Sequence, residues 1–132
     1  MVETYNQNSN PNMRRPVVKE EIVDFMRQRL QPVTGGLKEL EDFARAENVP
    51  VIPHETDAYF RLQPEKILEI GTAIGFSALL MAEHAPQAQI TTIDRNPEMI
   101  ELAKANFAKY DSRQQITLLE GDAMDLLETL EV

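Results

Sequence analysis

Apolar residues recur at helical spacing in the first third of the chain. They fall every three or four positions from Val18 to Leu30 and again from Leu37 to Ala44, so that one face of each segment is apolar. Pro32 and the Gly35-Gly36 pair stand between the two patterns, and we expect them to end the first helix. The pattern therefore predicts two consecutive amphipathic helices.

The segments around these helices differ from them in composition. Residues 1–12 are polar and rich in asparagine. Such a segment buries too little apolar surface to offset the entropy of ordering, so we expect a disordered tail. The stretch VPVIP at 49–53 favours an extended connection because of its prolines, and a short helix is expected at 56–62. Residues 13–63 are thus predicted to form an N-terminal helical entry region.

From Lys66 onward, short apolar runs alternate with helical segments. The runs are typical of buried strands, because they are bounded by glycine or proline or built on β-branched residues. Asn96 and Pro97 supply an N-cap and a favoured first helical residue. The expected strands are 66–70, 89–94 and 115–121, and the expected helices are 76–84, 97–110 and 123–130. This alternation predicts an α/β fold, with a parallel sheet and helices on its faces.

Composition narrows the classes of function. The 132 residues suit one domain, and 42% hydrophobic and 27% charged residues are ordinary for a globular protein. The chain has no cysteine, which excludes disulfides and thiolate metal sites. Without an apolar run of about 18 residues or a signal peptide, we expect a cytoplasmic protein with no membrane partner. The formal net charge of −9 disfavours nonspecific binding to nucleic acid.

A glycine-rich turn follows the first predicted strand. Gly71 and Gly75 bracket it in a G-x-x-x-G spacing, with the small Ala73 between them. Such a turn lets a ligand approach the backbone and presents the N–H groups of the next helix. The alternative is a tight turn that binds nothing, because glycine turns are common. The spacing differs from the G-x-G-x-x-G of dinucleotide-binding proteins.

Carboxylates are expected at the ends of all three strands, where parallel sheets bind ligands. Asp94 follows Gly71 by 23 residues, a spacing at which an acidic side chain can accept hydrogen bonds from both hydroxyls of a ribose. The alternative is an N-cap or a solvated charge, but Asn96 is the better cap. Asp122 can accept a hydrogen bond from an exocyclic amine such as that of adenine, while Ala123 offers its backbone N–H, or Asp122 simply caps the helix that follows. Glu69 ends an apolar strand and needs hydrogen-bond donors, either from a ligand or from nearby backbone N–H groups.

Three segments together resemble a known family. LEIGTAIGFSALLMA, TTIDRNPEMIELAKANF and ITLLEGDAMDLL are similar to the first motif blocks of class I S-adenosylmethionine-dependent methyltransferases. The Phe76-Ser77 pair and the segment VPVIPHET resemble more narrowly the O-methyltransferases of the catechol and caffeoyl-CoA type. The likeness extends over residues 14–131. It implies a Rossmann-like fold in which residues 64–132 form the S-adenosylmethionine-binding portion.

The resemblance also implies roles for individual residues. Glu69 and Ser77 would lie near the methionine part of the cofactor, and Asp94 would hold the ribose hydroxyls. Asp122 and Ala123 would flank the adenine. The remaining expected contacts come from the turn and, more weakly, from the entry segment: Gly71, Thr72, Gly75, Val51 and Ile52.

The resemblance further implies elements that this chain does not contain. The family's fourth strand lies beside its first and ends in an aspartate that helps to bind Mg²⁺ or a similar divalent metal, with further ligands and a lysine downstream. No residue here can be assigned to those roles, so the cofactor-binding portion is expected to be incomplete. An uncovered first strand would be an apolar edge, so we expect either a homodimer formed through it or a fragment of a longer protein.

Three hypotheses of function follow. The leading one is an O-methyltransferase that transfers a methyl group to a hydroxyl acceptor, either a small phenolic compound or a hydroxylated base of transfer RNA. The second is a module that binds S-adenosylmethionine or S-adenosylhomocysteine without catalysis. The third is an NAD-binding oxidoreductase domain, which the glycine spacing disfavours.

Overall fold

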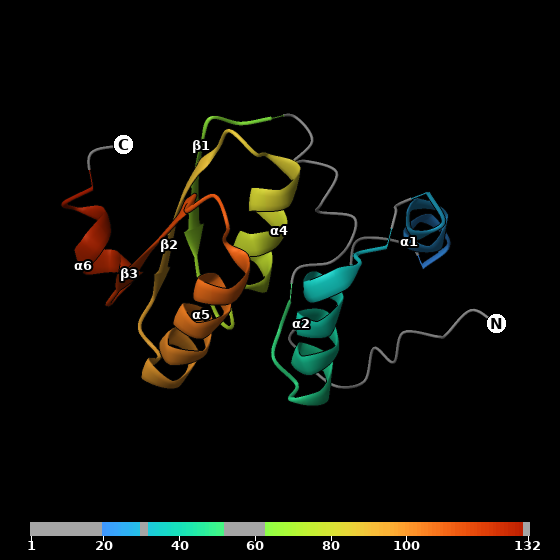
Figure 1. Ribbon diagram of the computed structural model, residues 1–132, viewed down its shortest axis with the longest axis horizontal. Coiled ribbons are helices and arrows are strands. Elements are labelled where there is room, and N and C mark those ends of the chain that lie inside the picture. The colour runs from blue at the N-terminus through green and yellow to red at the C-terminus, as the bar shows by residue number, and fades with distance from the viewer. Residues whose placement is uncertain (1–19, 30–31, 52–62, 131–132) are drawn as a thin grey trace.

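A computed structural model describes residues 20–29, 32–51 and 63–130 of the chain (Figure 1). The predicted alternation of strands and helices from residue 66 onward is confirmed. The elements are α1 (Glu20–Arg27), α2 (Gly35–Ala46), β1 (Lys66–Ile70), α4 (Phe76–His84), β2 (Gln89–Asp94), α5 (Pro97–Tyr110), β3 (Ile116–Glu120) and α6 (Ala123–Leu127). The expected tail at 1–12 and the expected helix at 56–62 lie outside the described residues.

The three strands form a parallel sheet in the order β1-β2-β3. In the register, Glu69 of β1 lies beside Thr92 of β2, and Asp94 at the end of β2 lies beside Glu120 of β3. Because the strands are parallel, all three carboxyl ends meet at one edge of the sheet. The α/β fold class predicted from the sequence is confirmed.

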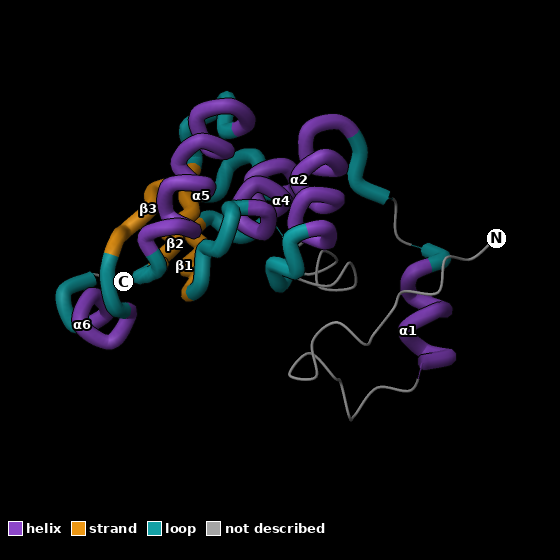
Figure 2. The backbone as a smooth tube through the Cα atoms, turned by 90° about the horizontal axis from the view of Figure 1, so that it is seen from below, coloured by secondary structure: helices purple, strands orange, loops and turns teal. Residues whose placement is uncertain are grey.

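Helices α4 and α5 pack against the same side of this sheet, and α2 lies beside α4 (Figures 1 and 2). The core fills the space between them. Almost every side chain of α4 is buried, which explains why its sequence is rich in alanine and leucine rather than amphipathic. Apolar residues of all three strands pack against these helices, among them Ile67, Ile90 and Ile116.

Two expectations for α2 need correction. The Gly35-Gly36 pair begins this helix instead of separating it from the first. A Cβ atom on Gly36 would lie 2.2 Å from the Tyr110 ring, so glycine allows the start of α2 to pack on the end of α5. Phe43, expected on the buried face, is 42% exposed, whereas Glu41 is buried and paired with Arg45.

The prediction that β1 is a buried strand is wrong for its outward face. Leu68 is 42% and Ile70 is 61% exposed, on the side of the sheet opposite α4. In the part of the chain that is described, β1 pairs only with β2, so its other edge is unpaired. Among the described residues, β1 thus combines an edge without a partner strand with apolar side chains exposed on its outward face. Within the described ranges, no helix is long and apolar enough to cross a membrane.

We expect the 132-residue chain to self-associate through β1, because an unpaired apolar edge readily pairs with another strand. Leu68→Lys should shift the chain toward monomer, as judged by sedimentation velocity over a range of concentrations. Leu102→Lys is the matched control, since Leu102 is 38% exposed but lies on α5. A chain that is monomeric at every concentration would contradict the expectation.

Candidate functional site

A cavity of about 350 Å³ opens at the carboxyl end of β1. Its volume falls in the range of small-molecule sites. Five of the residues predicted from the sequence line it, together with apolar neighbours: Pro50, Val51, Glu69, Ile70, Gly71, Thr72, Ala73, Ile74, Phe76 and Ser77. The predicted residue Ile52 lies outside the described residues.

The two glycines of the turn have different functions in the structure. Both have a positive φ, +95° at Gly71 and +88° at Gly75, which favours glycine. Above Gly71 a Cβ atom would meet nothing within 4 Å, so a ligand can approach the backbone there. At Gly75 a Cβ atom would lie 2.5 Å from the Phe107 ring, and Gly75 does not line the cavity. The absence of a side chain at Gly75 therefore allows the turn to pack on α5.

Asp94 fastens the turn to the end of β2. Its Oδ2 accepts a hydrogen bond from the Ala73 N–H at 2.8 Å, and its Oδ1 accepts from the Asn96 N–H at 2.9 Å. Asn96 itself caps α5 by accepting from the N–H groups of Glu98 and Met99, as the sequence predicted. Asp94 is thus half-buried beside the turn, with spare lone pairs on both oxygens.

Glu69 is held by two hydroxyl groups. Ser77 Oγ donates to Glu69 Oε1, and Thr92 Oγ1 donates to Glu69 Oε2 at 2.6 Å. Burial raises the pKa of the Glu69 carboxyl, and the negative charge of Asp94 raises it further, while the two hydroxyl donors lower it; the net direction is upward. The donors that Glu69 was predicted to need are therefore side-chain hydroxyls, not backbone N–H groups.

A buried threonine pair lies beneath the turn. Thr72 Oγ1 and Thr92 Oγ1 are 2.6 Å apart, and the two residues are 1% and 0% exposed. The side chain of Thr72 therefore bonds inward, although the residue was predicted as part of the ligand turn. Thr92 was missed in the sequence analysis. Its signal was a hydroxyl residue inside a buried strand, two positions before Asp94 and so on the same face of the sheet.

Asp122 and Ala123 lie apart from the cavity. Asp122 caps α6 by accepting from the Met124 N–H at 2.9 Å, which confirms the capping alternative. Its other oxygen accepts from Arg95 Nη1 at 3.0 Å. The N–H of Met124 and the Arg95 guanidinium lower the pKa of Asp122 below its ordinary value. Arg95 directly follows Asp94, so this ion pair links the end of β2 to the start of α6.

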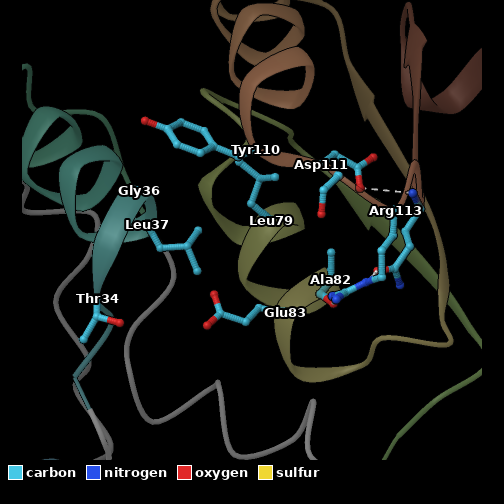
Figure 3. A pocket seen from close by; sticks show the side chains of 11 residues that line it. Thr34, Gly36, Leu37, Leu79, Ala82, Glu83, Tyr110, Asp111 and Arg113 are labelled. Carbon is cyan, nitrogen blue, oxygen red and sulfur yellow. Dashed lines mark hydrogen bonds between the residues drawn. The ribbon is translucent and has the colours of Figure 1, made fainter.

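A second cavity, of about 250 Å³, lies at the opposite end of the sheet (Figure 3). Most polar groups around it already connect the surrounding elements. Asp111 accepts from the N–H groups of Gln115 and Ile116, and Arg113 donates to the carbonyl oxygen of Ala82. These groups hold β3 to α4 and α5, and the Glu83 carboxylate lines the cavity beside them. The cavity lies away from the carboxyl ends of the strands, where such sheets bind ligands.

Comparison with known proteins decides the family. The model of the O-methyltransferase family matches residues 61–132, which is more than half of the chain. The chain belongs to the O-methyltransferase family. The matched region contains β1, the glycine turn, Asp94 and Asp122, so it includes the cavity described above apart from Pro50 and Val51.

Two relatives illustrate the range of enzymes that resemble this family member. Catechol O-methyltransferase of Mycobacterium tuberculosis is 34% identical over 70 residues, which cover 52% of this chain and 32% of that protein. The tRNA1(Val) (adenine(37)-N6)-methyltransferase of Vibrio campbellii is 42% identical over 59 residues, 45% of this chain and 25% of that protein. The chain thus spans a third or less of the length of these relatives.

Two solved structures share its fold. The S-adenosylhomocysteine-bound methyltransferase PaMTH1 of Podospora anserina superimposes with a TM-score of 0.73 and 25% identity, over 86% of this chain and 53% of that one. A putative caffeoyl-CoA O-methyltransferase of Staphylococcus aureus gives a TM-score of 0.68 and 30% identity, over 84% and 54% of the two chains. The Rossmann-like methyltransferase fold expected from the resemblance is confirmed.

We expect Ala73→Gly to leave the free energy of unfolding unchanged or to raise it by up to about 1 kcal/mol, because Ala73 has φ +48°, a left-handed conformation that costs an L-residue energy. The control is Ala105→Gly in the exposed interior of α5, which should lower it by about 1 kcal/mol. Urea unfolding measures both. Equal losses in the two variants would show that Ala73 is not strained.

Glu69→Gln should stabilise the ligand-free chain at neutral pH. A carboxyl whose pKa is higher in the folded than in the unfolded chain costs stability once pH rises through the interval between the two values. Glutamine removes this cost, so the temperature of unfolding should rise relative to the parent chain.

The gain should disappear below the ordinary carboxyl pKa, where Glu69 is protonated in both states. Calorimetric melting at a series of pH values tests this, with Glu101→Gln, whose side chain is 76% exposed, as the control. A Glu69→Gln variant that is less stable than the parent at neutral pH would contradict the analysis.

Proposed function

We propose that residues 64–132 bind S-adenosylmethionine, and that the protein transfers its methyl group to a hydroxyl acceptor. The observation that carries the proposal is the cavity at the end of β1, where a half-buried carboxylate, a hydroxyl and an open glycine backbone converge. Such a combination suits a ligand with a cationic amine on a compact chain. Residues 13–63 would form the entry region, of which Val51 contributes to the cavity.

The residues around the cavity fit the parts of this cofactor. Glu69 lines the cavity, and its carboxylate would accept from the amino group of the methionine part. The open space above Gly71 would admit the ligand close to the backbone, next to the start of α4, where no side chain caps the helix. A carboxylate or sulfonium group can approach closely there because no Cβ intervenes.

The far part of the cofactor would lie along the ends of β2 and β3. Each oxygen of Asp94 accepts one backbone N–H and keeps a lone pair, so Asp94 can still accept both ribose hydroxyls. Asp122 and Ala123 follow the next strand and would flank the adenine. Arg95, paired with Asp122, would border the same space.

When bound, S-adenosylmethionine supplies an electrophilic methyl group on a sulfonium sulfur. The contribution of this chain is to hold that group in a fixed position, which is the main requirement of an in-line transfer. In the parts of the chain that the structure describes, no three His, Asp or Glu side chains gather so as to hold a metal ion.

For the acceptor we favour a small hydroxyl compound over transfer RNA. A net charge of −9 repels a phosphate backbone, and Arg95, a cation at the carboxyl ends of the strands, is paired with Asp122. The relatives include both classes, since one is a catechol O-methyltransferase and another acts on an adenine of transfer RNA. A chain that binds the cofactor without transfer is distinguished by affinity without turnover on any phenolic acceptor.

Calorimetric titration of S-adenosylhomocysteine, with NAD as the control ligand, tests the proposal. We expect binding of S-adenosylhomocysteine alone, weakened roughly tenfold in Asp94→Asn, which keeps an acceptor for the Ala73 N–H but loses the charge. Asp42→Asn on the surface of α2 should bind normally. Preference for NAD, or equal affinity of Asp94→Asn and the parent chain, would overturn the assignment.

A further inference from the structure

Four side chains from four elements form one line of hydrogen bonds at the cavity. Thr72 of the turn lies 2.6 Å from Thr92 of β2, and Thr92 donates to Glu69 of β1 at 2.6 Å. Ser77 of α4 donates to the other oxygen of Glu69. Thr72, Glu69 and Ser77 all line the cavity, whereas Thr92 does not line it and is 0% exposed. Thr92 is therefore the member of the line that lies behind the cavity and joins the turn to Glu69.

The direction of this line is set by the carboxylate. An ionised carboxylate only accepts hydrogen bonds, and a hydroxyl has a single proton to give. Thr92 donates its one hydroxyl proton to the hydrogen bond with Glu69. In the contact between the two threonines, Thr72 must therefore be the donor and Thr92 the acceptor. A carboxylate at Glu69 thus orders both buried hydroxyls.

The same bonds fix the orientation of Glu69. Each of its oxygens holds one hydroxyl donor from the protein and retains a lone pair. With both oxygens held, the carboxylate does not need to rearrange when a cationic donor enters the cavity. A site whose groups are already oriented loses less free energy on binding.

We propose that Thr92 is a positioning residue that holds the Glu69 carboxylate, ionised and oriented, for the amino group of the ligand, with Thr72 as its donor. The inference rests on the proposed binding of S-adenosylmethionine. It adds a residue that never touches the ligand and acts only through Glu69. Because each hydrogen bond to the ionised form favours it, Thr92 also offsets part of the cost of burying the charge.

A merely structural function for Thr92 makes a different prediction. If the residue only fills space in β2, its loss lowers stability and weakens all ligands of the site alike. If it positions Glu69, its loss weakens only ligands that carry the amino group. Asp94 is the other titratable group whose charge acts on Glu69, and it stays unchanged in the test.

The test compares two ligands on Thr92→Val, which keeps the shape of threonine without its hydroxyl. S-adenosylhomocysteine carries the amino acid part, whereas 5′-methylthioadenosine has the same ribose and adenine without it. We expect Thr92→Val to bind S-adenosylhomocysteine roughly tenfold more weakly and 5′-methylthioadenosine within about twofold of the parent chain. The acidic limb of the pH profile for S-adenosylhomocysteine should move to higher pH, and Thr92→Ser should restore both properties.

Equal weakening of the two ligands, or no weakening of either, would overturn the proposal. A Thr92→Ser variant that behaves like Thr92→Val would do the same. If the parent chain binds neither ligand, the proposed function itself fails, and the positioning of a ligand by Glu69 fails with it. If the parent binds 5′-methylthioadenosine and S-adenosylhomocysteine equally, only the present inference fails.

A measurement without ligand covers the case in which Thr92→Val is poorly folded. Carbon-13 NMR titration of the Glu69 carboxyl should show a higher pKa in Thr72→Val than in the parent protein. In this variant Thr92 no longer accepts a hydrogen bond from Thr72, so it is a weaker donor to the Glu69 carboxylate. An unchanged Glu69 titration in a folded Thr72→Val variant would contradict the direction of the hydrogen bonds.

Discussion

The burial of one carboxylate, Glu69, sets the arrangement of the site. A charge at the end of an apolar strand costs free energy unless donors surround it, and the parallel register supplies them. Pairing of β1 with β2 brings Thr92 beside Glu69, and the turn into α4 returns Ser77 to the same carboxylate. Strand, turn and helix are therefore joined through a carboxyl whose pKa is raised by its burial. A buried carboxyl with a raised pKa beside a cavity is typical of a functional site.

In the turn above Glu69, the two glycines of one motif have different structural surroundings. Gly71 leaves an open surface over the cavity. At Gly75, the absence of a side chain leaves room for the Phe107 ring. Between them Ala73 has a left-handed backbone, and Asp94 holds its N–H in place. The hydrogen bond from the Ala73 N–H to Asp94 thus stabilises the left-handed conformation of Ala73. The shape of the turn therefore depends on β2 as well as on its own sequence.

Local signals explain why most elements could be predicted from the sequence. The Asn96-Pro97 start of α5 and the bounds of α4 and β2 follow from caps and short apolar runs, and they agree with the structure. The errors concern tertiary contacts. Nothing local shows that Gly36 packs on Tyr110, or that β1 has an uncovered face.

The same limit applies to the site. The sequence places the candidate carboxylates Glu69 and Asp94 at strand ends, and the structure confirms that position. The sequence cannot distinguish the glycine that packs against Phe107 from the glycine with an open surface, because both share one motif and a positive φ. Thr92 could not be found in the sequence for a related reason: threonine is common in strands, and only the register with Glu69 gives it a partner.

The chemical identity of an acceptor is harder still to predict from the sequence. Relatives named for a catechol and for an adenine match similar lengths of this chain, so the matched region does not by itself distinguish the two kinds of relative. The hydrogen bonds of the cavity do not distinguish them either, because Ser77 and Thr92 both donate to Glu69 and so hold residues of the chain to one another.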